Sequence, residues 1–355
     1  MAAGLRSGRG TFVLGSAVML VAVATGCSRE SVEPPDPAPE AFPALAGFQP
    51  MAIPADNPMT AAKVELGKQL YYDTRLSGDG RRSCYSCHLP EHGLTDGRPL
   101  AIGAFDRTLT RSSPTMWNVG YHQAWYWDGR ATTLEAQAQA AWRGANMGAS
   151  GNDGAPGMTD VCATLEAIPA YADRFREVFG EGCTPDNVPM ALAAFMRTIV
   201  STDSPWMRFR GGDTEALSES ARRGYELFNG RARCSTCHSG ILLADLQYHN
   251  VGIGMDTDNP DPGRFAVTNE ERDRGAFKTP TLMDVSRSAP YFHDGSVATL
   301  EEAVDLMLGG GLANPNLDTG NLQPVQLTPE ERADLLQFLR ELTATYPVAP
   351  PVLPG

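Results

Sequence analysis

The chain has 355 residues, of which 42% are hydrophobic and 20% charged, so it is long enough for two domains that each bury a core. This composition is ordinary for a soluble globular protein. The formal net charge of −13 argues against nucleic acid as a partner.

Residues 1–26 have the pattern of an export signal that is removed from the mature protein. Two arginines form a short basic region, and residues 11–25 form an apolar run that is too short to span a bilayer comfortably. The next residues resemble a lipoprotein cleavage box, so we expect Cys27 to be lipidated and to anchor the chain to a membrane in the periplasm. A plain secretory signal followed by a chance cysteine is the alternative. Removal of this segment changes the net charge to −15, because 27 basic and 42 acidic residues remain.

The rest of the chain divides into a tether and two folded units. Residues 27–50 are rich in Pro, Glu and Ala, which predicts an extended tether. We expect an N-terminal domain over residues 51–205 and a C-terminal domain over residues 206–347, with the boundary near residues 203–212. Residues 348–355 are expected to form a tail.

The folded part is predicted to be mainly α, with long loops rich in the 36 glycines and 27 prolines. No stretch shows a convincing strand alternation. We expect Thr60 to cap the first helix, and Thr132 and Glu135 have the spacing of a capping box. Thr328 is expected to open the final helix, with Pro329 at its first position. The predicted helices span residues 60–72, 132–143, 160–179, 185–200 and 328–342.

A Cys-x-x-Cys-His string occurs twice, at Cys84–His88 and Cys234–His238. Each copy is followed by Pro-Thr, then by Asp-Gly, then by Thr-Leu-Glu. The proline precedes the aspartate by 14 residues in both copies, and that aspartate precedes the glutamate by 7. The chain is therefore an internal duplication, and function should follow from the differences between the copies.

The repeated string is typical of covalent haem attachment. Two thiols three residues apart can form thioether bonds to the two vinyl groups of one haem, and the adjacent histidine then lies under the iron as an axial ligand. A zinc half-site or a thioredoxin-like redox pair would require only the two cysteines. Neither alternative explains the histidine that follows the cysteines in both copies. We therefore predict two c-type haems. The first is held by Cys84, Cys87 and His88, and the second by Cys234, Cys237 and His238.

The second axial ligand distinguishes the copies, because an occupied face gives an electron-transfer haem and an open face can bind peroxide. Met307 lies seven residues beyond Leu300, whereas Ala141 lies at the matching position of the first copy and cannot ligate. We predict a second haem with His238 and Met307 as ligands and a first haem with an open face. Met307 as a core residue and His122 as a ligand of the first haem remain alternatives.

Cys162 and Cys183 are the remaining cysteines. An exported chain meets an oxidising compartment, so we predict that they form a disulfide. Two buried free thiols are the alternative.

Together these residues resemble the bacterial di-haem cytochrome c peroxidases and their relatives of the MauG type. The resemblance covers roughly residues 51–346. Residues 54–63 also look like the MbnH branch, whose members modify a partner protein. The segments that carry the resemblance are 84–97, 111–115, 126–138, 234–238, 277–282 and 289–295.

The resemblance implies two mainly helical, cytochrome c-like domains that face each other. In this family the N-terminal haem is the reaction site, the C-terminal haem accepts electrons, and a tryptophan that matches Trp127 relays them. Met307 matches the methionine ligand of the family, where MauG-type members carry tyrosine. Members often form homodimers. A calcium ion usually lies between the domains, at positions that match Ser112, Thr279 and Pro280, although Ser112 replaces the usual asparagine.

Two departures from the family pattern concern the first haem. Residues 97–113 contain no histidine, so we expect its distal face to be open without reductive activation. Gln137 is retained in the distal pocket beside Ala141, but Asn146 replaces the catalytic glutamate of the family. Asparagine cannot titrate, so it cannot move a proton between the two oxygens of peroxide.

The leading hypothesis is an exported di-haem oxidoreductase that reduces hydrogen peroxide to water. Its electrons would come from a one-electron donor such as a small cytochrome c or a cupredoxin. A MauG- or MbnH-like oxidation of Trp or Tyr in a partner protein is one alternative. A non-catalytic electron carrier is another, which the missing glutamate supports and Ala141 opposes.

Overall fold

The computed structural model describes residues 8, 10–11 and 41–355. Cys27 and almost all of the predicted signal and tether lie outside the described residues. Residues 41–355 lie within one compact unit, and none of the helices in the described part is long and apolar enough to cross a bilayer. The division into two haem domains at residue 205 stays a prediction.

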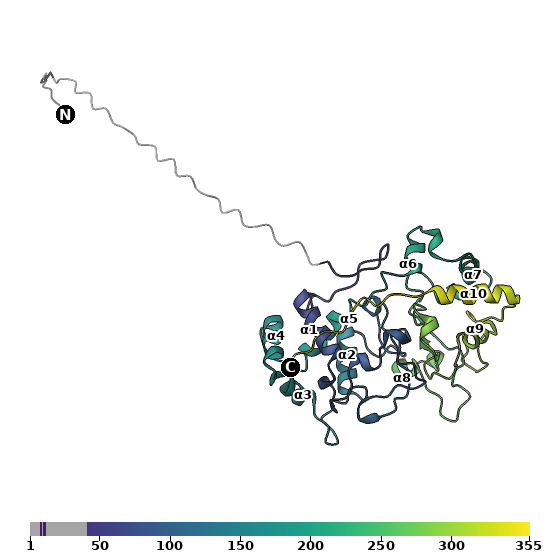
Figure 1. Ribbon diagram of the computed structural model, residues 1–355, viewed down its shortest axis with the longest axis horizontal. Helices are drawn as coiled ribbons and strands as arrows, with labels where there is room; N and C mark the ends of the chain where they lie inside the picture. The colour runs from purple at the N-terminus through teal and green to yellow at the C-terminus, as the bar shows by residue number, and fades with distance from the viewer. Residues whose placement is uncertain (1–7, 9, 12–40) are drawn as a thin grey trace, which may run out of the picture. The chain divides into compact units, whose positions relative to one another are not determined.

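The mainly α class is confirmed, because short helices and long loops build most of the described chain (Figure 1). Strand structure is confined there to one antiparallel pair, β1 (Tyr248–His249) and β2 (Phe277–Lys278), apart from isolated bridges. The α-helices are α1 (Ala61–Tyr72), α2 (Leu134–Arg143), α3 (Met158–Glu166), α4 (Pro169–Phe179), α5 (Asn187–Met196), α6 (Pro205–Arg210), α7 (Glu219–Asn229), α8 (Phe265–Thr268), α9 (Leu300–Leu308) and α10 (Pro329–Glu341).

Two of the expected helices differ in detail from the structure. The helix expected over residues 160–179 is two helices, α3 and α4, because Pro169 begins a new helix and has no backbone N–H to continue the preceding one. The cap of α2 is Thr133 and not Thr132, since the Thr133 side chain accepts the hydrogen bond from the N–H of Ala136. The expected caps of α1 and α10, Thr60 and Thr328, are confirmed.

The duplication reappears as two matching helix pairs, in which α1 packs on α5 and α7 packs on α10. Gly67 of α1 and Gly224 of α7 stand at equivalent places. A Cβ atom at Gly67 would collide with the carbonyl oxygen of Ala191, and one at Gly224 with the carbonyl oxygen of Asp334. Glycine therefore permits the same close helix approach in both copies.

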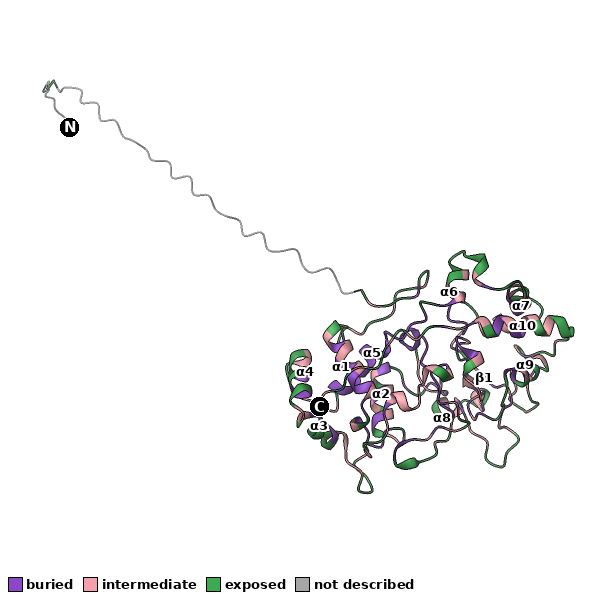
Figure 2. Ribbon diagram, viewed as in Figure 1, coloured by how far each residue is buried: buried purple, intermediate pink, exposed green. Residues whose placement is uncertain are grey.

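One hydrophobic cluster runs through both copies, from Leu66 to Ala344. Nine of the ten residues of α5 are buried, which makes it the central helix of the first copy (Figure 2). The chain after α10 returns to the first copy (Figure 1), where the Arg75 side chain donates a hydrogen bond to the carbonyl oxygen of Pro354. The tail is thus packed against the first copy.

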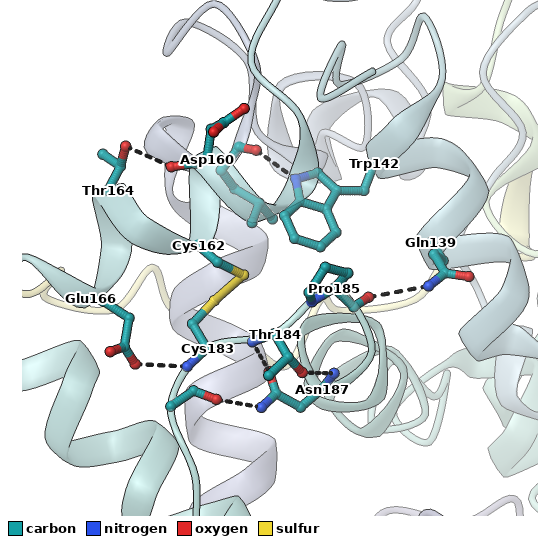
Figure 3. The surroundings of a disulfide bond; sticks show 12 residues. Gln139, Trp142, Asp160, Cys162, Thr164, Glu166, Cys183, Thr184, Pro185 and Asn187 are labelled. Carbon is teal, nitrogen blue, oxygen red and sulfur yellow. Dashed lines mark hydrogen bonds between the residues drawn. A yellow bond between two sulfur atoms is a disulfide. The ribbon is translucent and has the colours of Figure 1, made fainter. Parts of the chain in front are cut away.

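A disulfide joins Cys162 of α3 to Cys183 in the loop after α4 (Figure 3). The N–H of Cys183 also donates to the carboxylate of Glu166, at the end of α3. Asn187, the first residue of α5, donates from its side chain to the carbonyl oxygen of Gly182. The disulfide loop is therefore fixed to both α3 and α5.

The two helix-contact glycines can be tested by substitution. Gly67→Ala and Gly224→Ala should each lower the free energy of unfolding by about 1–3 kcal/mol, because the added methyl group overpacks a close helix contact. Equilibrium unfolding in urea measures the change. Gly320→Ala is the control, because a Cβ atom there meets only a side-chain oxygen at 3.5 Å. Equal stability of all three variants would contradict the role of the glycines.

Candidate functional site

Both Cys-x-x-Cys-His strings fold in the same way. Each forms one turn of 3-10 helix, over Cys84–Ser86 and Cys234–Thr236. The histidine that follows places its Nδ1 atom 3.0 Å from a backbone carbonyl oxygen, that of Leu94 in the first copy and of Leu243 in the second. A carbonyl only accepts, so Nδ1 carries the proton and Nε2 keeps a free lone pair, as in metal-ligating imidazoles.

Burial favours the uncharged form of the two imidazoles and of three thiols in the strings. Burial lowers the pKa of His88 and of His238. Burial also raises the pKa of Cys84 and Cys234 to about 12, and that of Cys87 to about 11. None of the four thiols joins a disulfide, whereas the reactive thiol of a thioredoxin-like pair has a lowered pKa. The strings therefore do not match a redox pair.

A cavity of about 260 Å³ adjoins the second string and extends to the first copy. Free thiols, an imidazole with an open Nε2 and a largely apolar cavity together fit a covalently bound haem. The wall of this cavity includes Cys234, Cys237, His238 and Met307 from the second copy, and Ser112, Ser113, Pro114 and Trp127 from the first.

The two copies differ at the positions expected for a second axial ligand. Met307 on α9 lines the cavity of the second string. Ala141 on α2 is half-buried and offers no ligand atom. Gln137 is also half-buried on α2, whereas Asn146 lies in the following loop and is exposed. Coordination of iron by Met307 stays a prediction.

Tyr126 is a residue of this region to which the sequence pattern assigned no role. Its backbone has a φ of 68°, a conformation that a non-glycine residue seldom adopts without support. The Arg130 guanidinium lies 3.6 Å from its ring centre, and its hydroxyl donates to the carbonyl oxygen of Gln137 at 3.1 Å. Tyr126 thus joins the Trp127 turn to α2.

Trp127 lies where the two copies meet. Its indole Nε1 donates to the carbonyl oxygen of Ser112 at 3.0 Å, and its own carbonyl oxygen accepts from the N–H of Lys278 at 2.8 Å. The N–H of Ser112 donates in turn to the carbonyl oxygen of His293 at 2.7 Å. Since His293 is the counterpart of Trp127 in the duplication, the two equivalent turns are joined through Ser112.

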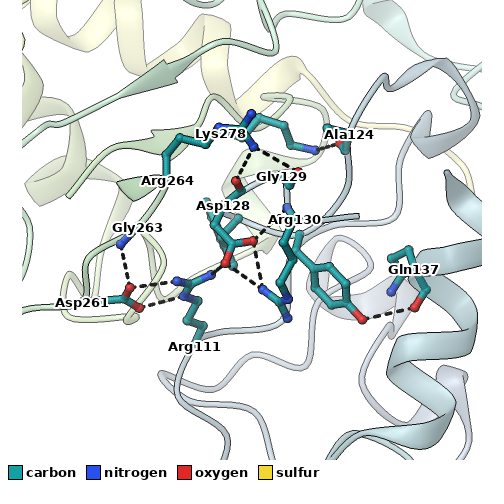
Figure 4. Close-up of polar contacts among 12 residues, drawn as sticks. Arg111, Ala124, Asp128, Gly129, Arg130, Gln137, Asp261, Gly263, Arg264 and Lys278 are labelled. Atoms are coloured by element: carbon teal, nitrogen blue, oxygen red, sulfur yellow. Dashed lines mark hydrogen bonds and ion pairs between the residues drawn. The ribbon is translucent and has the colours of Figure 1, made fainter. Parts of the chain in front are cut away.

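Arg111 holds this junction by charge (Figure 4). Its guanidinium donates two hydrogen bonds to Asp261 of the second copy, at 2.7 and 2.8 Å, and one to Asp128 at 2.7 Å. Arg264 of the second copy donates to the carbonyl oxygens of Asp128 and Gly129. A bidentate, charge-assisted pair of this kind fixes geometry as well as energy. The Arg111–Asp261 pair, together with the hydrogen bond from Arg111 to Asp128, therefore fixes the position of the turn that carries Trp127.

Lys278 is a buried lysine beside the same turn. Its Nζ donates to the carbonyl oxygen of Ala124 at 2.7 Å and lies 3.2 Å from Nδ1 of His122. Burial lowers the pKa of Lys278 to about 8, and burial together with the charge of Lys278 lowers the pKa of His122. His122, the alternative ligand of the first haem, is therefore a neutral partner of Lys278.

Two other histidines support the second site. His249 lies between Asp318 (Nδ1 to Oδ2, 2.6 Å) and Asp245 (Nε2 to Oδ2, 3.0 Å). Hydrogen bonds with Cys237, Asp318 and Asp245 raise the pKa of His249 to about 10, although conversion of Cys237 to a thioether removes the first of these. His293 stacks on Phe277 with ring centres 3.6 Å apart.

The residues predicted to bind calcium already have hydrogen-bond partners or offer few oxygen ligands. The Ser112 hydroxyl donates to the carbonyl oxygen of Phe292, and its own carbonyl oxygen accepts from Trp127. Ser112, Thr279 and Pro280 include no carboxylate, whereas calcium favours six to eight oxygen ligands with carboxylates among them. These three residues alone therefore do not make a typical calcium site.

The chain is similar to known proteins over most of its length. A family model described as "Di-haem cytochrome c peroxidase" matches residues 61–215. Cytochrome-c peroxidase IdrP1 of Denitromonas iodatirespirans is 37% identical, over 95% of this chain and 96% of that protein. Methylamine utilization protein MauG of Methylorubrum extorquens is 39% identical, over 82% of this chain and 81% of its own length.

The fold is also similar to a solved structure. This is the crystal structure of a MauG-like protein associated with microbial copper homeostasis, which is 33% identical to this chain. The two superpose with a TM-score of 0.75, over 85% of this chain and 95% of that one.

The attachment of haem can be tested on the purified protein. We expect a mass increase equal to two haems that survives extraction with acidified organic solvent, because thioether bonds are covalent. The double variant C84A/C87A should lose one haem, and C234A/C237A the other. The variant C162A/C183A is the control and should keep both. Release of haem from the wild-type protein by this extraction would contradict covalent attachment.

Proposed function

Because the chain belongs to the family of di-haem cytochrome c peroxidases and MauG proteins, we propose that it reduces hydrogen peroxide at the first site with electrons that arrive through the second. The family carries two c-type haems. The observation that carries the proposal is the difference between two otherwise matching sites, with Met307 at the second and Ala141 at the first.

A haem at each site would supply an iron that exchanges single electrons and can bind peroxide where a ligand position is open. His88 and His238 would hold the iron through Nε2, and the four cysteines would hold the macrocycles. The Met307 thioether would close the second site and raise its reduction potential. Ala141 would leave room on the first.

Trp127 supports the path of electrons between the sites. It lies in the cavity wall of the second string, and its carbonyl oxygen is hydrogen-bonded to Lys278 of the second copy. The indole N–H of Trp127 donates a hydrogen bond to the neutral carbonyl of Ser112, which fixes the orientation of the ring without placing a charge beside it. Reduction of one peroxide to two waters takes two electrons and two protons, so the donor delivers electrons twice per turnover.

Neither polar residue predicted for the distal pocket of the first haem can transfer a proton. Gln137 on α2 can orient peroxide but cannot titrate, and Asn146 cannot replace the glutamate of the family. Asn146 is exposed, so water can reach this position. We therefore expect slow turnover with water carrying the proton.

The second candidate function is oxidation of Trp or Tyr in a partner protein. Similarity to MauG and to the MauG-like copper-homeostasis protein favours it. The methionine at position 307 favours a small electron-transfer donor, because MauG-type members carry tyrosine there. A stable oxidised state after peroxide addition, without turnover of a small cytochrome c or cupredoxin, would distinguish the partner-protein reaction.

We also propose export to the periplasm with a lipid on Cys27. The disulfide between Cys162 and Cys183 supports an oxidising compartment. Homodimer formation and calcium binding remain expectations from the family.

A stopped-flow reaction with peroxide tests the proposed function. The haem-loaded protein should show a rapid spectral change and consume peroxide when a donor is present. Asn146→Glu should raise the rate by about a hundredfold, because a positioned acid–base group contributes 10²–10⁴. Asn152→Glu, at an exposed loop position, is the matched control. A wild-type protein without spectral response to peroxide would reject the proposal.

Exchange of the ligand positions tests the asymmetry. Electron paramagnetic resonance of the ferric wild type should show one high-spin and one low-spin haem. Met307→Leu should make the second haem high-spin, and Ala141→Met should weaken the reaction of the first with peroxide. Met196→Leu changes a buried methionine of α5 and should alter neither signal. Two low-spin haems in the wild type would mean an electron carrier.

A further inference from the structure

Trp117 differs from every other tryptophan of this chain in its hydrogen-bond partner. Its Nε1 donates to the carboxylate Oδ2 of Asp284 at 2.8 Å, and both residues are 1% exposed. The described residues include all five tryptophans, and the other four donate to backbone carbonyl oxygens. These four are Trp125, Trp127, Trp142 and Trp206.

This partner changes what an oxidised indole can do. Loss of one electron makes the indole N–H strongly acidic. A carbonyl oxygen cannot take up that proton, so oxidation of Trp142 or Trp206, which are as buried as Trp117, would leave a buried cation, which is costly. A carboxylate can take it up, and burial raises the pKa of Asp284, which makes it a better base. Trp117 can therefore lose an electron and a proton without a new buried charge.

Aromatic rings connect Trp117 to the first Cys-x-x-Cys-His string. Trp117 meets Tyr346 edge to face, with ring centres 6.3 Å apart. The hydroxyls of Tyr346 and Tyr72 are 3.2 Å apart. Tyr72 in turn stacks on Tyr85 with ring centres 4.5 Å apart. Tyr85 lies between Cys84 and Cys87, so this chain of rings ends at the predicted first haem.

A purely structural role explains only part of this arrangement. Asp284 also accepts from the N–H of Ala344 and lies 3.5 Å from Arg287, so it does bind the C-terminal segment. That role requires a buried carboxylate. It does not require that three tyrosines, which can each lose an electron, lead from the tryptophan to the haem string.

We propose that Trp117, with Asp284 as its proton acceptor, is a redox-active residue that supplies an electron to the first haem site through Tyr346, Tyr72 and Tyr85. The inference rests on the proposed reaction with peroxide. Without a donor, peroxide would take one electron from Trp117, whose proton passes to Asp284, and one from the first haem site. The two protons of peroxide would leave in one water, and its second oxygen would stay at that site.

The electron is returned when the external donor acts. The donor then supplies two electrons, one to the Trp117 radical and one to the first haem site. The proton returns from Asp284 to Nε1, and two protons from solvent release the second oxygen of peroxide as water. Trp117 would thus hold an oxidising equivalent away from the haem whenever peroxide arrives before the donor. Trp127 lies on the proposed electron route between the two haem sites. Trp117 lies on a separate electron route, which leads to the first haem site alone.

Rapid freeze-quench electron paramagnetic resonance tests the proposal. The full haem-loaded chain is mixed with equimolar peroxide without donor, and residue oxidation is mapped by peptide mass spectrometry. We expect a protein radical and oxidation products on Trp117 and Tyr346. Trp117→Phe should abolish the tryptophan signal. Asp284→Asn keeps a hydrogen-bond acceptor but accepts no proton, so the radical yield should fall about tenfold.

Trp206→Phe is the matched control, because Trp206 is as buried as Trp117 but donates to the carbonyl oxygen of Ile241. It should leave the radical unchanged. Tyr72→Phe and Tyr346→Phe each remove a single hydroxyl and should lower the radical yield even if Trp117→Phe does not fold. Unchanged radical and oxidation patterns in Asp284→Asn, Tyr72→Phe and Tyr346→Phe would overturn the inference but leave peroxide reduction intact. Absence of any reaction of the wild type with peroxide would overturn both.

Discussion

The ion pairs of Arg111 are the interaction on which the arrangement of the two sites depends. Arg111 belongs to the first copy, and its bidentate partner Asp261 to the second. Its third hydrogen bond goes to Asp128, which follows Trp127 directly. Asp128 is almost fully buried, where an unpaired carboxylate would be costly. The need to pair the charges of Arg111, Asp128 and Asp261 thus fixes where the two copies meet. It also fixes the position of Trp127, the predicted relay residue.

Duplication and divergence explain the rest of the site. The two copies share the elements that hold a cofactor, which are the helix pair with its contact glycine and the string whose histidine bonds to a carbonyl. They differ in the side chains that decide chemistry, since methionine and alanine occupy equivalent places on α9 and α2. Trp127 and His293 likewise occupy equivalent turns that now meet at one junction. A common scaffold can therefore support one site that reacts and one that transfers electrons.

Hydrogen-bond partners give the two central tryptophans different chemistry. The indole of Trp127 bonds to a neutral carbonyl and can pass an electron only while it keeps its proton. The indole of Trp117 bonds to a carboxylate and can release both. The difference matters most at Trp117, which is buried, because an uncompensated charge is costly there. Two tryptophans ten residues apart in sequence thus suit two different tasks.

The sequence by itself determined what is local or periodic in this protein. The haem strings, the caps at Thr60 and Thr328 and the equivalence of the two copies follow from residues close together in the chain. Local signals also produced an error, since Pro169 begins a second helix within residues 160–179, which were predicted to form one helix. Only the tertiary structure decided the pairs Arg111–Asp261 and Trp117–Asp284, which are 150 and 167 residues apart. Such pairs form because packing brings distant segments together and buried polar groups must then find partners, a requirement that no local pattern encodes.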